Sequence, residues 1–472
     1  MTISKSGLCR IAALVAVVST STAAFAQNPI ASNNGMYPKA SEYGGPLNLS
    51  NLDYPDRVPP WYDIWELGAD TPDGSLTPAA AGAYMERFKV HLGGKIRTLI
   101  NEPEAWDPKQ TGMFDMIWMG DGSDPTSGRE AIMNTYTGQI VPSDSWTEQY
   151  RPTTSHMQNY GVVYYDALAA TTLARVWANM YNPDLNGFSF PPGSVIVKVE
   201  AATVAVDEWP IRNSNGMVTG SVLEGSATWN VFRPTTDSQL EHDHDSKHEL
   251  KNVVQQVHPV QIAVKVKDPV ASPKTGWVYM GFVYDSQSAD DSGGPWGRFV
   301  PAGATWGNDP DGARDPSGLP PDGVLKETWV NPNAPGFIRD TLGWGGRMAA
   351  PMDVARRHNV LMPDGTRIPK GQDIAVSSCM SCHGSAQYPF VANLYPSPNV
   401  TFPLDGEQFL LYTPGSEEWA QWFQNRPGDE PMTPHLGGVA LDYDLMSMFA
   451  LSSWAGAVGN EGFAFERFDI HH

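Results

Sequence analysis

The chain has 472 residues and a formal net charge of −21, with 52 acidic against 31 basic side chains. Such an acidic surface repels nucleic acid and anionic membrane surfaces, so neither is an expected partner. The 45 glycines, 40 prolines and 16 tryptophans argue against a helical bundle and indicate a loop-rich chain with aromatic anchors. The length favours two or three domains.

Residues 1–26 have the features of a secretory signal. Lys5 and Arg10 give a basic start, an apolar run extends from Ile11 to Val18, and Ala24-Phe25-Ala26 matches an A-x-A cleavage site. The apolar run is too short to span a bilayer, so we expect a cleaved signal peptide, no transmembrane segment and a periplasmic protein. Cleavage removes two basic residues and no acid, which changes the net charge to −23.

The stretch 27–189 is predicted to hold an N-terminal arm and a helical segment. Its first part is rich in proline, glycine, asparagine and aspartate and has no regular apolar pattern. Thr77 followed by Pro78 predicts the start of a helix, since threonine is a good N-cap and proline fits the first helical position. Asp166 predicts a second cap, because apolar residues at helical spacing follow it.

The apolar pattern changes to that of strands in the stretch 190–344. Four runs of β-branched or aromatic residues, separated by turn residues, predict a β-rich domain with an antiparallel sheet or sandwich and a wrap rich in Trp and Pro. In one run Lys265 and Lys267 alternate with valines, and we expect both lysines to face solvent. The runs are 194–200, 226–232, 260–267 and 277–284.

A polar stretch over 241–248 contains three histidines and three acidic residues. These side chains could hold Zn²⁺, Cu²⁺ or Ca²⁺. The spacing matches no known ligand motif, however, and a solvated connection between two strands explains the same composition. We therefore expect no stoichiometric metal at this cluster.

The most specific motif is Cys379-Met380-Ser381-Cys382-His383, which has the C-x-x-C-H spacing of a c-type haem attachment site. Two thiols three positions apart can bond the two vinyl groups on one porphyrin edge, and the adjacent histidine can supply an axial nitrogen. A redox C-x-x-C, a structural zinc site and a disulfide between Cys379 and Cys382 are the alternatives. The first lacks a thioredoxin-like setting, the second lacks two ligands, and the third leaves His383 unexplained.

Residues 345–472 are predicted to form the haem domain. Short helices are expected over 405–412 and 416–424, and a last one from Asp442, with loops of proline and glycine between them. This layout resembles the all-α cytochrome c fold. The predicted fold class is therefore α+β, with the β-rich domain followed by an all-α cytochrome c-like domain.

The chain also resembles c-type cytochromes at the motif itself. Its β-rich part is similar, over 190–198, 275–279 and 306–310, to large single-haem bacterial proteins of the cytochrome c family that have no assigned substrate, and the stretch 378–387 around the motif is similar to them too. The resemblance implies one covalent haem c, secretion and a β-plus-α layout. It implies no particular reaction.

The sixth ligand of the iron decides between the functions that such a haem can have. Cytochrome c folds usually supply a methionine from a loop some tens of residues after the motif. Met432 fits, because it lies 49 residues after His383 and between two prolines, and His435 is its rival. Two protein ligands indicate electron transfer, whereas an open position allows peroxidase, nitric-oxide or oxygen chemistry.

We therefore expect a periplasmic mono-haem c-type cytochrome that acts in electron transfer, alone or as part of an oxidoreductase. The acidic surface favours a redox partner with a basic docking surface. The alternative is a haem enzyme that binds a small-molecule substrate between the β-rich domain and the haem. A third hypothesis is a binding protein whose β-rich domain docks a partner. The sequence leaves open whether the protein is an enzyme.

Overall fold

The computed structural model describes most of the chain between residues 35 and 458. The predicted signal peptide lies outside the described residues. The described residues are 35–119, 125–290, 292–339, 342, 344–349, 360–361, 367–368, 378–390, 408–409 and 412–458.

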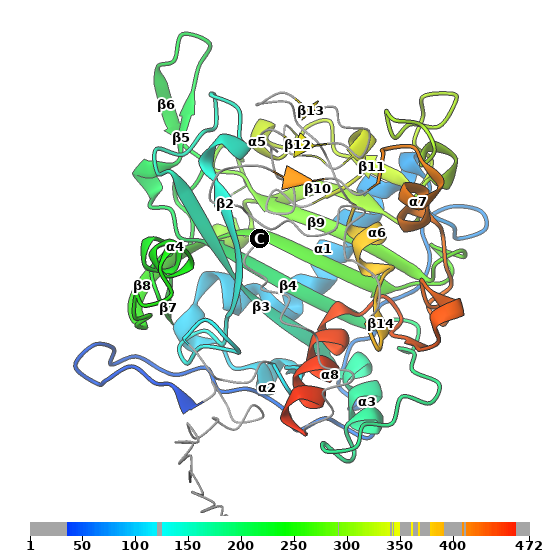
Figure 1. The fold of residues 1–472 in the computed structure, drawn as a ribbon, viewed down its shortest axis with the longest axis horizontal. Coiled ribbons are helices and arrows are strands. Elements are labelled where there is room, and N and C mark those ends of the chain that lie inside the picture. Colours follow the sequence, from blue (N-terminus) through cyan, green and yellow to red (C-terminus); the bar gives the residue numbers. More distant parts are fainter. Residues whose placement is uncertain are drawn as a thin grey trace, which may run out of the picture.

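A nine-stranded antiparallel sheet forms the centre of the molecule (Figure 1). Seven strands follow the order β1-β3-β4-β8-β9-β10-β11, while β2 pairs with β3 and β7 pairs with β8. The strands are β1 (Met113–Phe114), β2 (Tyr136–Pro142), β3 (His156–Asp166), β4 (Val195–Ala202), β7 (Trp229–Arg233), β8 (Val253–Lys267), β9 (Trp277–Tyr284), β10 (Phe299–Thr305) and β11 (Thr328–Val330). The sheet thus begins well before residue 190.

Helix α1 (Pro78–Asn101) covers one face of the sheet (Figure 1). The Thr77 side chain accepts a hydrogen bond from the Ala80 amide at 3.3 Å, which confirms the predicted cap. An apolar stripe that includes Phe88 and Leu92, both fully buried, shares one core with alternate side chains of β4, β8 and β9. Since every residue of β9 is buried, the other face of the sheet is covered as well.

The opposite face carries α3 (Ala167–Val176), α6 (Cys379–His383) and α8 (Leu445–Ala457). Asp166 caps α3 as predicted, through a 2.7 Å hydrogen bond from the Ala169 amide. A second core joins these helices to the sheet. Its members from the helices and the segment before α8 include Leu173, Met380, Leu441, Tyr443 and Met448, and those from the sheet include Tyr165, Ile196, Trp277 and Tyr279.

The predicted fold class is wrong. The described residues show an antiparallel, β-rich fold with few helices, and they contain no separate all-α cytochrome c-like domain. The physical reason is that α6 and α8 are short and bury their apolar side chains against the sheet, so they share its core and do not enclose one of their own. The helix expected over 405–412 is also wrong where it is described, because Gln408–Phe409 form strand β15.

The remaining described elements are short. They are α2 (Pro108–Thr111), α4 (Thr236–His244), α5 (Gly336–Arg339), α7 (Glu417–Ala420), β5 (Pro210–Arg212), β6 (Val218–Ser221), β12 (Val360–Leu361), β13 (Arg367–Ile368), β14 (Gln387–Tyr388), β15 (Gln408–Phe409) and β16 (Val439–Ala440). The β5–β6 hairpin projects from the body (Figure 1). Within the described part of the chain, no helix combines the length and the hydropathy needed to cross a membrane.

Candidate haem-attachment site

The Cys379–His383 segment forms one helical turn, α6, whose start is fixed by the residue before it. The Ser378 side chain accepts a hydrogen bond from the Ser381 amide, and the Ser381 side chain accepts one from the Ser378 amide, at 3.2 and 2.7 Å. This reciprocal cap satisfies amides at the start of a helix. Cys379 and Cys382 are three residues apart, so both half-buried side chains project from one side of the turn.

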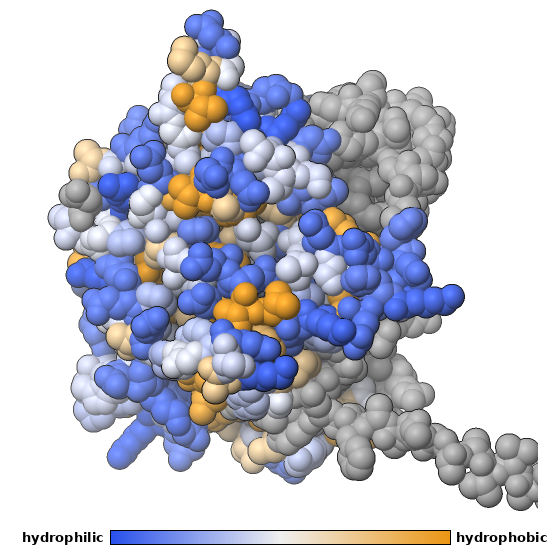
Figure 2. Space-filling model, turned by 90° about the vertical axis from the view of Figure 1, so that its left-hand side faces the viewer, coloured by the Kyte–Doolittle hydropathy of each residue, from blue (hydrophilic) through white to orange (hydrophobic). Residues whose placement is uncertain are grey.

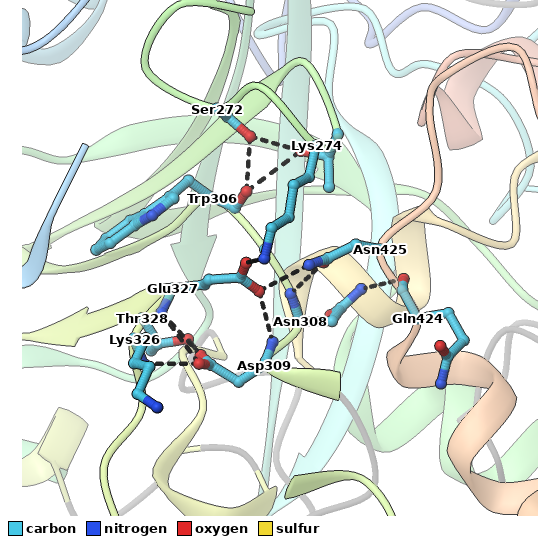
Figure 3. Close-up of polar contacts among 12 residues, drawn as sticks. Ser272, Lys274, Trp306, Asn308, Asp309, Lys326, Glu327, Thr328, Gln424 and Asn425 are labelled. Atoms are coloured by element: carbon cyan, nitrogen blue, oxygen red, sulfur yellow. Dashed lines mark hydrogen bonds and ion pairs between the residues drawn. The ribbon is translucent and has the colours of Figure 1, made fainter. Parts of the chain in front are cut away.

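Ser378 is held by a polar network, and Figure 3 shows the part of it around Asn308, Glu327 and Asn425. The Ser378 hydroxyl donates to Asn308 Oδ1 at 3.2 Å. Asn308 in turn donates from its amide to Asn425 Oδ1 at 2.7 Å and from Nδ2 to the Gln424 carbonyl at 3.0 Å. Glu327 accepts from Asn425 Nδ2 at 2.8 Å, so four chain segments meet at the start of α6.

Two carboxyl groups of this network have shifted pKa values. Burial alone would raise the pKa of Glu327, but hydrogen bonds from Asn425 and Lys274 lower it overall. The Lys274 ammonium lies 2.6 Å from a Glu327 oxygen. Asp309, which follows Asn308 with a left-handed φ of 43°, has its pKa raised by burial. The charged Glu327 therefore gives the network a fixed acceptor next to the helix.

The half-buried His383 is oriented by the main chain of a distant segment. Its Nδ1 lies 3.0 Å from the Tyr443 carbonyl oxygen, and because a carbonyl can only accept, Nδ1 carries the proton. Burial and the positive charge of Lys265 lower the pKa of His383 to about 3, so the ring is neutral. Nε2 makes no hydrogen bond to any residue that the structure describes. The ring also packs on Tyr279, with the centroids 4.9 Å apart.

The segment that carries this carbonyl is held in a strained conformation. Asp442 and Tyr443 have φ values of 47° and 64°, in the left-handed region that non-glycine residues rarely adopt. Asp442 is fully buried and accepts hydrogen bonds from Trp277 Nε1 and the Phe190 amide, both at 2.8 Å, and from Lys267 Nζ at 2.5 Å. These contacts, two of them with the sheet, offset the backbone strain.

Asp444 anchors the other end of the segment. Its carboxylate lies 3.1 Å from Lys265 Nζ and accepts from the Tyr165 hydroxyl at 2.7 Å. It also caps α8 through the Ser447 amide at 3.0 Å, so the last helix begins two residues later than a cap at Asp442 would place it. Lys265 is only 4% exposed, which shows that the outward orientation expected for it was wrong.

The residues present fit a c-type haem. A neutral imidazole whose Nδ1–H donates a hydrogen bond to a carbonyl offers Nε2 to a metal, and this arrangement fixes the ring orientation of histidine ligands in proteins. Cys379, Cys382 and His383 could therefore attach the porphyrin and bind its iron.

The predicted sixth ligand lies in a loop that is tied to the residues after α6. Met432 is buried, and the next residue, Thr433, exchanges hydrogen bonds with the side chain of Gln387 at 2.9 to 3.2 Å. Strand β14 also pairs with β16, where Gln387 lies opposite Ala440. The loop is therefore tied to β14 at Thr433 and again at Ala440. His435, the rival ligand, is exposed.

The polar stretch over 241–248 lies on and after α4, away from these contacts. His242 Nδ1 lies 2.6 Å from the His248 carbonyl, and His248 pairs with Glu241 at 3.3 Å. Across the described residues, no group of three or more His, Cys, Asp or Glu side chains is arranged to hold a metal ion.

Comparison with protein-family models, with curated proteins and with solved structures gives no match to this chain. The interpretation of the site therefore depends on its residues and their geometry.

Proposed function

We propose that the chain carries one covalent haem c at Cys379, Cys382 and His383 and acts in electron transfer in the periplasm. The observation that supports this best is the hydrogen bond from His383 Nδ1 to the Tyr443 carbonyl. It leaves Nε2 available, next to two half-buried thiols on one side of a capped helical turn. When bound, a haem supplies a one-electron centre whose potential the protein adjusts through its ligands and their hydrogen bonds.

Met432 is the sixth ligand in this proposal. A buried thioether on a loop fixed to Gln387 by Thr433 is already held in position, so a bond to iron would cost little ordering. Soft thioether sulfur favours ferrous iron and raises the potential. A six-coordinate iron with two protein ligands has no open position for a substrate, and it therefore serves electron transfer.

The partner in this proposal is a redox protein with a basic surface. The chain is strongly acidic. The described part of the face in Figure 2 is largely hydrophilic, and its apolar patches are small and separate. Charge complementarity, more than apolar contact, would then guide encounter on such a surface.

A second candidate function is a haem enzyme, and one observation favours it. Helix α6 lies directly on the sheet, with the His383 ring against Tyr279 of β9. A substrate site between the β-rich part and the motif would then include Tyr279. An optical spectrum separates the candidates, because a low-spin ferric iron indicates two protein ligands and a high-spin iron indicates an open position.

The experiment that tests haem attachment compares the wild-type protein with the variant Cys379→Ala/Cys382→Ala. Both are produced with the host's haem-attachment machinery and extracted with acidified organic solvent. We expect the wild-type protein to keep its haem and the variant to lose it. Release of haem from the wild-type protein, or a wild-type protein purified without haem, would contradict the proposal.

A further inference from the structure

The Tyr443 carbonyl oxygen accepts hydrogen bonds from other side chains besides His383. Lys265 Nζ donates to the same oxygen at 2.7 Å, and the Tyr279 hydroxyl donates to it at 3.2 Å. The oxygen thus has three donors around it and only two lone pairs. Because His383 Nδ1 and Lys265 Nζ each lie within 3.0 Å of this oxygen, they are less than 6 Å from one another.

Lys265 is fixed at this place by the sheet. It lies on β8, opposite Tyr279 of β9 and Ile196 of β4, with its ammonium 4.9 Å from the centre of the Trp277 ring. Burial lowers the pKa of Lys265, and the Asp444 carboxylate at 3.1 Å opposes that change. A buried cation of this kind costs free energy unless it is paired.

We infer that Lys265 is a positioning residue that sets the electron-donating strength of His383 and so raises the reduction potential of the haem. This inference rests on the proposed function, since it needs an iron bound at His383. Because the buried lysine shares a carbonyl acceptor with the histidine, it can influence the iron through His383 without contacting the iron itself.

A hydrogen bond from Nδ1 to a carbonyl makes the imidazole a stronger donor, which favours ferric iron. Lys265 opposes this in two ways, and both raise the reduction potential. The Lys265 ammonium draws on the lone pairs of the same oxygen, so the oxygen accepts less strongly from His383. Its positive charge also disfavours the ferric state, which carries one more positive charge than the ferrous state.

The test is a redox titration of the purified holoprotein and its Lys265→Met variant. We expect the variant to have a lower potential, with an equilibrium constant for reduction that falls on the order of tenfold. For a one-electron couple, tenfold corresponds to about 59 mV. Lys265→Arg, which keeps a charged donor, should recover part of the shift.

A matched control is Lys267→Met, two residues along the same strand. It removes an equal charge that pairs with Asp442, but Asp442 keeps its hydrogen bonds from Trp277 and Phe190, so the contact of Lys265 with the Tyr443 carbonyl stays in place. The shift should be clearly smaller than for Lys265→Met. Equal shifts would show that only net charge matters and would overturn the role assigned to the shared carbonyl.

A third variant removes a donor without removing charge. Tyr279→Phe loses the hydroxyl that donates to the Tyr443 carbonyl and keeps the ring that packs on His383. We expect a small decrease in potential, and this variant tests the inference even if Lys265→Met fails to fold. Unchanged potentials in both Lys265→Met and Tyr279→Phe, with haem attached, would overturn the inference alone. A wild-type protein without covalent haem would overturn the proposed function as well.

Discussion

The two faces of the central sheet are buried by different chemistry. Under α1 the contacts are mostly hydrocarbon, with side chains such as Phe88 and Leu92 fully buried against alternate residues of the strands, and the polar contacts of the helix, such as that of Tyr84 with Asp268, are hydrogen bonds. Under α6 and α8 the sheet presents Lys265 and Lys267, each paired with an aspartate of the segment before α8. Apolar packing gives stability and tolerates small displacements, whereas buried ion pairs fix a segment in one position. The face that orients His383 is the one with the ion pairs.

The largest expected effects are on the free energy of unfolding, and they come from one substitution on each face of the sheet. Asp442→Ala would leave Lys267 without its buried partner and Trp277 Nε1 without an acceptor, at a cost of about 3–5 kcal/mol in the free energy of unfolding. Leu92→Ala on the other face creates a cavity and costs about 2–5 kcal/mol. Chemical denaturation measures both.

The two variants should differ more clearly in the haem spectrum than in stability. Asp442→Ala releases the residue before the carbonyl that orients His383, so the spectrum of the haem should change. Leu92→Ala should leave that spectrum as it is. If Leu92→Ala changed the spectrum as much as Asp442→Ala, the distinction between the two faces would be wrong.

The next largest effect concerns a buried carboxylate without an ion pair. Asp166 is 1% exposed, accepts from the Tyr62 hydroxyl and the Ala169 amide, and forms no salt bridge with any described residue. Burial raises the pKa of Asp166 to about 6. The unfolded value is near 3.9, so the folded state holds the proton more tightly between these pH values. Stability contributed by this group is therefore present below about pH 4 and is lost as pH rises to about 6, by up to about 3 kcal/mol.

The variant Asp166→Asn keeps an acceptor for the Ala169 amide and removes the titration. Its free energy of unfolding should vary less with pH between 4 and 6 than that of the wild-type protein. Asp115→Asn is the matched comparison, because burial also raises the pKa of Asp115 to about 6. If Asp166→Asn and the wild-type protein gave parallel curves, the carboxyl of Asp166 would not be protonated in this range.

A smaller effect on stability, but a specific one on the spectrum, is expected at Met432. Met432→Ala should remove the far-red band that sulfur-to-iron coordination produces and should lower the potential, since a thioether favours ferrous iron. The residues that fix the loop, Thr433 and Gln387, remain in place, so the fold should change little. If the spectrum did not change, Met432 would not be the sixth ligand, and either His435 or no residue of the chain would have that role.

The smallest effect is on encounter with a partner. Exposed charges are screened over about 8 Å at physiological salt, so the electron-transfer rate with a basic redox protein should fall as salt rises. Stopped-flow kinetics across ionic strength measure this rate, with an acidic redox protein as the control. A rate that does not depend on salt would place the acidic surface away from the haem and favour the enzyme candidate.

Local rules predicted the parts of the fold that depend on neighbours in sequence. The cap at Thr77 and strand β9 follow from the chemistry of a few adjacent residues. Local rules did not predict the fold class, because it depends on which surface the short helices pack against. Helix α8 packs against the sheet. The sequence of a short apolar helix does not show whether the helix will pack on a sheet or on other helices.

In the candidate site too, the residues that are adjacent in sequence could be predicted and their distant partner could not. The motif residues are adjacent in sequence, so their shared chemistry could be seen at once. The partner of His383 is a main-chain carbonyl, which has no residue type to mark it. One signal was present, however. Lys265 and Lys267 stand in an apolar strand with the same two-residue spacing as Asp442 and Asp444, which matches the pairing that the structure shows.

The contact between His383 and Tyr443 also has a consequence for the order of assembly. The two residues are 60 positions apart, and the lysine that shares the carbonyl precedes Tyr443 by 178 positions. During synthesis the thiols of α6 emerge before the segment that orients the histidine. The imidazole of His383 can therefore be oriented only after the later segment has been made, and contacts between residues so distant in sequence form slowly. The ion pairs of Asp442 and Asp444 with the sheet then complete the surroundings of α6 as a late step of folding.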